Sequence, residues 1–222
     1  MYTRILIGIN VLAYLWELAT GALSSDQGLI NAGAIYGPDI AAGQWWRIVT
    51  GSFLHGGFLH ILFNMVALWQ VGMFTEQVFG KNRMLVLYTI SMFGGGWAIY
   101  QFSYSEITVG ASGAIFGIFG SLTAAGIMLG PRGRALVTSN IGIIVINLLI
   151  GFMAPTHISN AGHIGGLISG FIAGFILMPR RLLRPAPVPS QAYYDPKTIE
   201  GEALYDSARD GPEPAEKKQE LQ

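Results

Sequence analysis

Long apolar segments alternate with short breaks of glycine, proline or charged residues over residues 1–178 of the chain. Each segment is close to the roughly 20 residues with which an α-helix crosses a bilayer. The pattern predicts six transmembrane helices, at residues 4–22, 57–75, 83–103, 112–130, 134–153 and 160–178. The first segment also has features of a signal peptide, but it is longer than the usual apolar core and contains Asn10 and Glu17.

The remaining residues fall into two regions of different composition. Residues 23–56 are rich in Trp, Ile, Gly and Pro, which favours a folded loop at the membrane surface. Residues 185–222 hold eight acidic and four basic side chains and almost no apolar run, which is typical of disorder. The sequence therefore predicts a membrane domain over residues 1–178, followed by a disordered tail over residues 179–222.

Composition supports the same class of protein. The chain is 51% hydrophobic and 12% charged, with a mean hydropathy of +0.46, whereas soluble domains contain about 25% charged residues. We therefore expect an all-α, polytopic membrane protein. The chain has no cysteine, which excludes disulfides and thiolate metal sites. It also lacks a basic patch, so no nucleic-acid partner is expected.

The basic residues predict the orientation in the membrane. If the six helices alternate in direction, one side of the membrane receives Arg4, Lys81, Arg83, Arg132, Arg134, Arg180, Arg181 and Arg184. Only Arg47, in the loop after the first helix, falls on the other side. Since Lys and Arg concentrate in cytoplasmic loops, we expect both termini to be cytoplasmic and residues 23–56 to be extracytoplasmic.

Three of the predicted helices carry unusual polar groups near the same, outer end. Ser112 begins the fourth helix within the stretch GASGAIFG, and His163 lies at the start of the sixth. His60 and Asn64 lie one turn apart in the outer part of the second helix. An ionisable side chain inside a membrane is expensive and indicates a function. Each group alone is also compatible with a structural hydrogen bond between helices, but their common depth indicates a site.

Small residues repeat every four positions on the fourth and sixth predicted helices, which predicts that these helices pack closely. The two stripes are Gly113, Gly117, Ser121 and Ala125, and Gly162, Gly166, Gly170 and Gly174. Ser112 and His163 each lie next to a stripe, so contact between the stripes would bring the hydroxyl close to the imidazole. The stripes by themselves predict only packing.

Two other kinds of site are disfavoured. A zinc protease would need a motif such as H-E-x-x-H, and no carboxylate is close in sequence to His60 or His163. The G-x-S-x-G elbow of soluble hydrolases is missed because Ala114 occupies the position of its second glycine. We therefore expect no metal and no cofactor.

Five motifs in this order resemble the rhomboid family of intramembrane serine proteases, over residues 1–178. They are WWR at 45–47, HGGFLHILFN at 55–64, Glu76 before the glycine of FG, GASGAIFG at 110–117 and GHIGG at 162–166. The resemblance implies a six-helix bundle in which a Ser–His dyad opens to the outside through a water-filled cavity. It also implies a location in the membrane, most simply the plasma membrane of a bacterium.

The resemblance also implies roles for individual residues. Ser112 matches the nucleophile and His163 the general base, while His60 and Asn64 match side chains of the oxyanion hole. Supporting positions are Gly110, Gly113, Phe116, His55 and Arg47. The family often has tyrosine four residues after the serine, so Phe116 is a departure; its ring can stack on the imidazole, but it has no hydroxyl.

Elementary chemistry leads to the same assignment. A serine hydroxyl is a poor nucleophile until a base takes its proton, and a positioned base contributes roughly 10²–10⁴-fold. At a helix N-terminus, Ser112 lies beside backbone N–H groups that have no intrahelical acceptor. These groups, the Asn64 amide and a His60 N–H are expected to bind an oxyanion. Since no Asp or Glu has a motif link to His163, we expect a dyad rather than a triad.

The expected substrate is the outer end of another protein's transmembrane helix, with small or helix-breaking residues that unwind easily. Residues 134–159 are the expected gate for its entry. Two alternatives stay open: a rhomboid-like pseudoprotease that binds membrane clients without cutting them, and a small transporter, although no internal repeat is evident. The oligomeric state and the role of the tail are not predicted.

Overall fold

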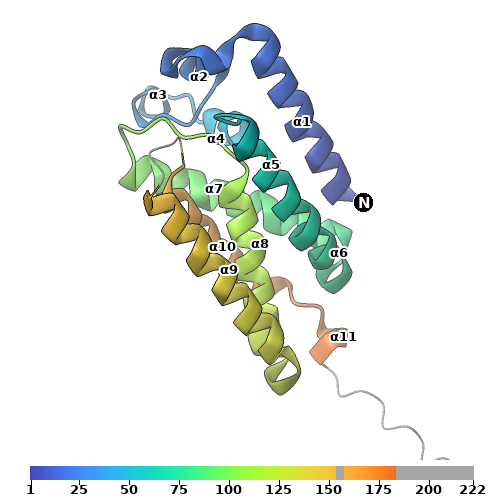
Figure 1. Cartoon of the computed structure of the whole chain (residues 1–222). Helices are drawn as coiled ribbons and strands as arrows, with labels where there is room; N and C mark the ends of the chain where they lie inside the picture. The colour runs from blue at the N-terminus through green and yellow to red at the C-terminus, as the bar shows by residue number, and fades with distance from the viewer. Residues whose placement is uncertain (154–157, 184–222) are drawn as a thin grey trace, which may run out of the picture. The chain divides into compact units, whose positions relative to one another are not determined.

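A computed structural model of the chain describes residues 1–153 and 158–183 (Figure 1). Within these residues the structure is helical, and backbone pairing outside helices is limited to an isolated antiparallel bridge between Ile35 and Thr108. The all-α prediction is therefore confirmed for the described part of the chain. Residues 184–222 lie outside it, and the disordered tail stays a prediction.

Helices occupy each of the six predicted ranges in the described residues. They are α1 (Tyr2–Thr20), the continuous run of α5 (Phe58–Ala67), η2 (Leu68–Gly72) and α6 (Met73–Phe79), then α7 (Lys81–Phe102), α8 (Ser112–Met128), α9 (Arg134–Met153) and α10 (Asn160–Leu177). Within the second helix, η2 is a π-helical segment. By length and apolar composition, the described residues contain two helices that could cross a membrane, Phe58–Phe79 and Asn160–Leu177, and the apolar α8 is shorter.

The region between the first two long helices is folded. It contains η1 (Ala22–Ser24), α2 (Asp26–Ala32), α3 (Gly37–Ala41) and α4 (Arg47–Gly51). Two further short helices lie later in the sequence. The first, η3 (Gly130–Gly133), precedes α9, and the second, α11 (Arg180–Leu183), follows α10. These short elements are too brief to be predicted from periodicity; α2, for example, ends at Gly33, which adopts a left-handed conformation.

The core is built around α8, which contacts α7, α9 and α10. From Ala114 to Gly126 every residue of α8 except Thr123 is buried. The predicted contact between the two small-residue stripes is confirmed: a Cβ at Gly166 would overlap the carbonyl of Gly113, and one at Gly170 would overlap the carbonyl of Gly117. Only glycine allows the two backbones to approach this closely.

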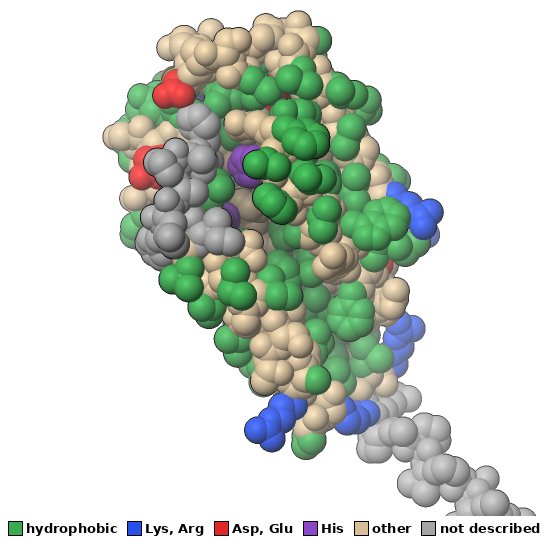
Figure 2. All heavy atoms as spheres, viewed as in Figure 1, with side chains coloured by type: hydrophobic (Ala, Val, Ile, Leu, Met, Phe, Trp, Pro, Cys, Tyr) green, Lys and Arg blue, Asp and Glu red, His purple; other side chains and the backbone are tan. Residues whose placement is uncertain are grey.

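The surface is strongly apolar. Large hydrophobic side chains are exposed on every long helix, for example Leu12, Phe63 and Ile176, and such extensive apolar exposure is typical of a surface that faces lipid. Figure 2 shows Lys and Arg side chains at the lower end and right edge of the viewed face, and Asp and Glu side chains at its upper left. Histidine side chains are visible between hydrophobic ones in the upper part of the same face (Figure 2).

Candidate active site

Ser112 is the first residue of α8, and the loop that leads to it is fixed by two backbone contacts with the region before α5. Ile35 and Thr108 form the isolated bridge, and the N–H of Gly110 donates to the carbonyl of Gly51 at 2.9 Å. Gly110 has a φ of +121°, a conformation that residues with a side chain rarely adopt. The serine hydroxyl is therefore presented by a constrained turn at the N-terminus of a buried helix.

His163 lies in the first turn of α10 and meets this hydroxyl. Its Nε2 is 2.8 Å from Oγ of Ser112, a hydrogen-bond distance. The α10 N-terminus is fixed by Ser159, whose hydroxyl accepts the N–H of Gly162 at 3.3 Å. The glycine contacts between α8 and α10 hold the two helices at the separation that this distance needs.

The imidazole is oriented by stacking rather than by a carboxylate. The ring of Phe116 lies parallel to that of His163, with centroids 4.1 Å apart and an interplanar angle of 5°. Nδ1 of His163 is buried and has no hydrogen-bond partner among the described residues. A small cavity of 10 Å³ borders Ser112 and His163, which is close to the space that one water molecule needs.

His60 lies on α5 beside the loop that leads to Ser112, and Asn64 lies one turn later on the same helix. A Cβ at Gly110 would be 2.8 Å from Nε2 of His60, so the absence of a side chain at Gly110 lets the imidazole approach the loop before Ser112. Nδ1 of His60 accepts the N–H of Gly56 at 3.4 Å. The Asn64 amide donates to the His60 carbonyl at 2.9 Å, which uses one of its two hydrogens.

His55 is fully buried just before α5. Its backbone N–H donates to both carboxylate oxygens of Glu17, at 3.2 and 3.0 Å, and its ring lies edge-on to that of His60 with centroids 5.2 Å apart. Burial, followed by the electrostatic effect of His60, lowers the pKa of His55 from 6.5 to about 3, against the opposing effect of the Phe53 carbonyl. His55 is therefore a neutral, structural imidazole at pH 7.

Arg47 holds together the folded region before α5. Its guanidinium forms an ion pair with Asp39 at 2.8 Å and donates to the side chain of Gln44 at 2.8 Å. It also donates to the backbone carbonyls of Ile30 and Ala34, at 2.6 and 3.2 Å. These contacts connect α2, α3 and α4, so Arg47 acts on the loop and lies outside the Ser112–His163 pair.

Reasoning from the sequence missed the role of Glu17. The sequence marks it as a polar exception in the first apolar segment, but no local pattern indicates that it accepts the N–H of a residue 38 positions later. The available signal was its burial in an apolar helix, because a buried carboxylate requires donors. It lies at the end of α1 that adjoins the segment leading to α5, and it fixes that segment.

The sequence of this chain is similar to a known protein family and to several known proteins. The family model for the Rhomboid domain matches residues 42–180. The chain is 39% identical to "Rhomboid protease GluP" of Bacillus subtilis (strain 168) over 79% of its own length and 34% of the relative. It is 37% identical to "RHOMBOID-like protein 5" of Arabidopsis thaliana, over 77% of this chain and 54% of that one. "Rhomboid protease AarA" of Providencia stuartii is 30% identical, over 81% and 74%. The chain thus spans between a third and about half of the length of the first two relatives.

Proposed function

This chain belongs to the rhomboid family, and on that premise we propose that it is an intramembrane serine endopeptidase. The proposal depends on one observation above all, the 2.8 Å contact between His163 Nε2 and Ser112 Oγ. A hydroxyl hydrogen-bonded to an imidazole is the arrangement by which a base activates a serine. The names of GluP and AarA describe proteases, which agrees with this chemistry.

In the proposed reaction His163 takes the proton of Ser112 as the hydroxyl attacks the scissile carbonyl. The tetrahedral intermediate carries a negative oxygen, which the backbone N–H of Ser112, the second hydrogen of the Asn64 amide and His60 stabilise. Each such donor typically contributes about 2.7–4 kcal/mol. His163 then protonates the leaving amine, and a water molecule hydrolyses the acyl-enzyme by the same steps in reverse order.

Phe116 and the glycine contacts perform the task that a carboxylate performs in a triad. The parallel ring at 4.1 Å limits rotation of the His163 imidazole, and the backbone contact between Gly113 and Gly166 fixes its distance from Ser112. Holding the reacting groups in place supplies much of the rate enhancement of an enzyme. A dyad in this setting is therefore sufficient for hydrolysis.

The proposed substrate is the outer end of another protein's transmembrane helix. Basic residues at the end of the bundle that contains η3 and α11, such as Arg132 and Arg181, are exposed, and the positive-inside rule assigns such an end to the cytoplasm. The Ser112–His163 pair, at the opposite ends of α8 and α10, is then extracytoplasmic. Small or helix-breaking residues in the substrate would unwind there at little cost.

The proposal is tested by cleavage of a model transmembrane substrate by the purified protein in detergent, beside Ser112→Ala and His163→Ala. We expect cleavage by the wild type only, with all three proteins folded by circular dichroism. Cleavage that survives both substitutions would refute the dyad. Binding of the substrate without cleavage by the wild type would instead favour a pseudoprotease.

A further inference from the structure

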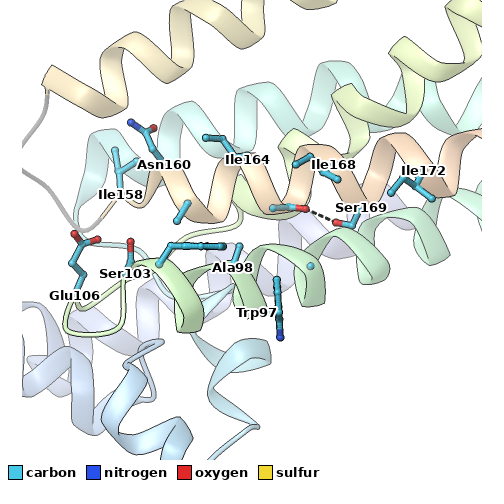
Figure 3. Close-up of a pocket in the computed structure, with 14 residues that line it drawn as sticks. Trp97, Ala98, Ser103, Glu106, Ile158, Asn160, Ile164, Ile168, Ser169 and Ile172 are labelled. Atoms are coloured by element: carbon cyan, nitrogen blue, oxygen red, sulfur yellow. Dashed lines mark hydrogen bonds between the residues drawn. The ribbon is translucent and has the colours of Figure 1, made fainter.

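A second feature of the molecule lies away from the Ser112–His163 pair: a groove of 720 Å³ between α7 and α10. Figure 3 shows its residues along the two helices, from Asn160 to Ile172 on α10. The floor is formed where the backbones touch, because a Cβ at Gly165 would be 2.7 Å from the carbonyl oxygen of Gly94. Nothing in the proposed reaction uses this groove.

The walls of the groove are apolar and exposed. On α7 they are formed by Trp97 and Phe102, with exposed fractions of 54% and 76%, and on α10 mainly by isoleucines such as Ile168, at 54%. The hydroxyl of Ser169 donates to the carbonyl of Gly165 at 2.6 Å, as the dashed line in Figure 3 marks. The middle of the groove therefore offers mainly hydrocarbon surface to an occupant.

One end of the groove is polar and negatively charged. The hydroxyls of Ser103 and Ser159 hydrogen-bond to each other at 3.1 Å. Glu106 is the one charged residue that lines the groove, it is exposed, and it forms no ion pair within residues 1–153 and 158–183. Figure 3 shows its carboxylate at the end of the groove nearest Ile158. An occupant must therefore combine an apolar length with a cationic end.

The length of the groove suits an extended hydrocarbon chain. The 13 residues from Asn160 to Ile172 rise about 18 Å along α10. An acyl chain can lie along this length between the apolar side chains of α7 and α10.

We propose that the groove between α7 and α10 binds a phospholipid whose headgroup carries an ammonium group, such as phosphatidylethanolamine. An acyl chain lies along Trp97 and Ile168, and the ammonium pairs with the Glu106 carboxylate. An anionic headgroup would meet the same carboxylate with the wrong sign. The site is independent of the proposed hydrolysis, so it can be tested on the Ser112→Ala protein.

The test uses quenching of tryptophan fluorescence by lipids with brominated acyl chains, titrated into detergent micelles that contain the Ser112→Ala protein. The contribution of Trp97 is the difference between this protein and its Trp97→Phe variant. We expect brominated phosphatidylethanolamine to quench Trp97 at a mole fraction roughly two- to fivefold lower than brominated phosphatidylglycerol, the range of an exposed ion pair. With Glu106→Gln the two lipids should give the same curve.

Trp16 provides the matched control, because it is 49% exposed on α1 and outside the groove. Its contribution, measured with Trp16→Phe, should show no headgroup preference. Equal quenching of Trp97 by the two lipids in the presence of Glu106 would overturn the proposal. Displacement of the brominated lipid by a transmembrane substrate peptide would also overturn it, and would assign the groove to a helix.

Discussion

Replacing Gly166 by alanine tests whether the packing of α8 against α10 sets the distance between Ser112 and His163. A Cβ at Gly166 would overlap the backbone carbonyl of Gly113. Because backbone atoms cannot rotate away, the helices would have to separate by roughly 1 Å or more to reach the contact distance of about 3.5–4.0 Å. Gly113 follows Ser112 directly, and His163 lies one turn before Gly166, so the movement acts on the pair itself.

The size of the effect follows from this displacement. Overpacking of a core contact typically costs about 1–3 kcal/mol of the free energy of unfolding. An opening of roughly 1 Å would lengthen the 2.8 Å contact beyond the range of a hydrogen bond, and a misplacement of this size lowers a rate roughly 100-fold. We therefore expect Gly166→Ala to lower kcat roughly 100-fold and to reduce stability by about 1–3 kcal/mol.

The assay is substrate cleavage in detergent together with thermal unfolding of the same samples. Gly170→Ala would overlap the Gly117 backbone one turn farther from His163, so it should lose similar stability with a smaller loss of kcat. Gly8→Ala is the matched control, because nothing lies within 4 Å of the added Cβ; it should keep full activity and gain up to about 1 kcal/mol. Wild-type kcat and stability in Gly166→Ala would refute the reasoning.

Three further predictions concern residues around the pair. Phe116→Leu removes the parallel ring, so kcat should fall up to roughly tenfold with KM unchanged, since an aromatic pair contributes about 0.5–1.5 kcal/mol; an unchanged kcat would contradict an orienting role. Arg47→Lys should lower the thermal midpoint of unfolding, because an ammonium cannot replace the planar fork of donors; an unchanged midpoint would contradict the role of Arg47 in connecting α2, α3 and α4. His55 has a pKa of about 3 in the folded protein and 6.5 as its ordinary value, so the unfolded state binds a proton that the folded state does not. Stability should therefore fall by up to about 1.4 kcal/mol per pH unit from about pH 6 to pH 3, and unfolding of His55→Asn across that range should show a shallower slope.

Features that depend on periodicity could be predicted from the sequence. The apolar segments predicted where the long helices lie, and the four-residue repeat of small residues predicted the contact of α8 with α10. The depth of Ser112 and His163 in their segments predicted that the two side chains would come together, and they lie 2.8 Å apart. Their roles in catalysis stay predictions.

Features that depend on a single long-range contact could not be predicted. The carboxylate of Glu17 accepts the N–H of His55, 38 positions later, and the path of the folded region between them is encoded by no local pattern. The π-helical segment from Leu68 to Gly72 reads LWQVG, and no local pattern separates it from the α-helical turns on either side. The groove between α7 and α10 lies over the close contact of Gly94 with Gly165, and its shape depends on how the two helices pack in the bundle.

Reaction of Ser112 with a fluorophosphonate is the most direct measurement of the central claim, because it reports nucleophilicity without a substrate. The wild type, His163→Ala and Ser112→Ala would be labelled in detergent and the modified peptide identified by mass spectrometry. The account predicts one adduct on Ser112 in the wild type, a rate roughly 10²–10⁴-fold lower without the base, and no adduct in Ser112→Ala. An inert Ser112 in the folded wild type, or labelling that is unchanged in His163→Ala, would contradict it.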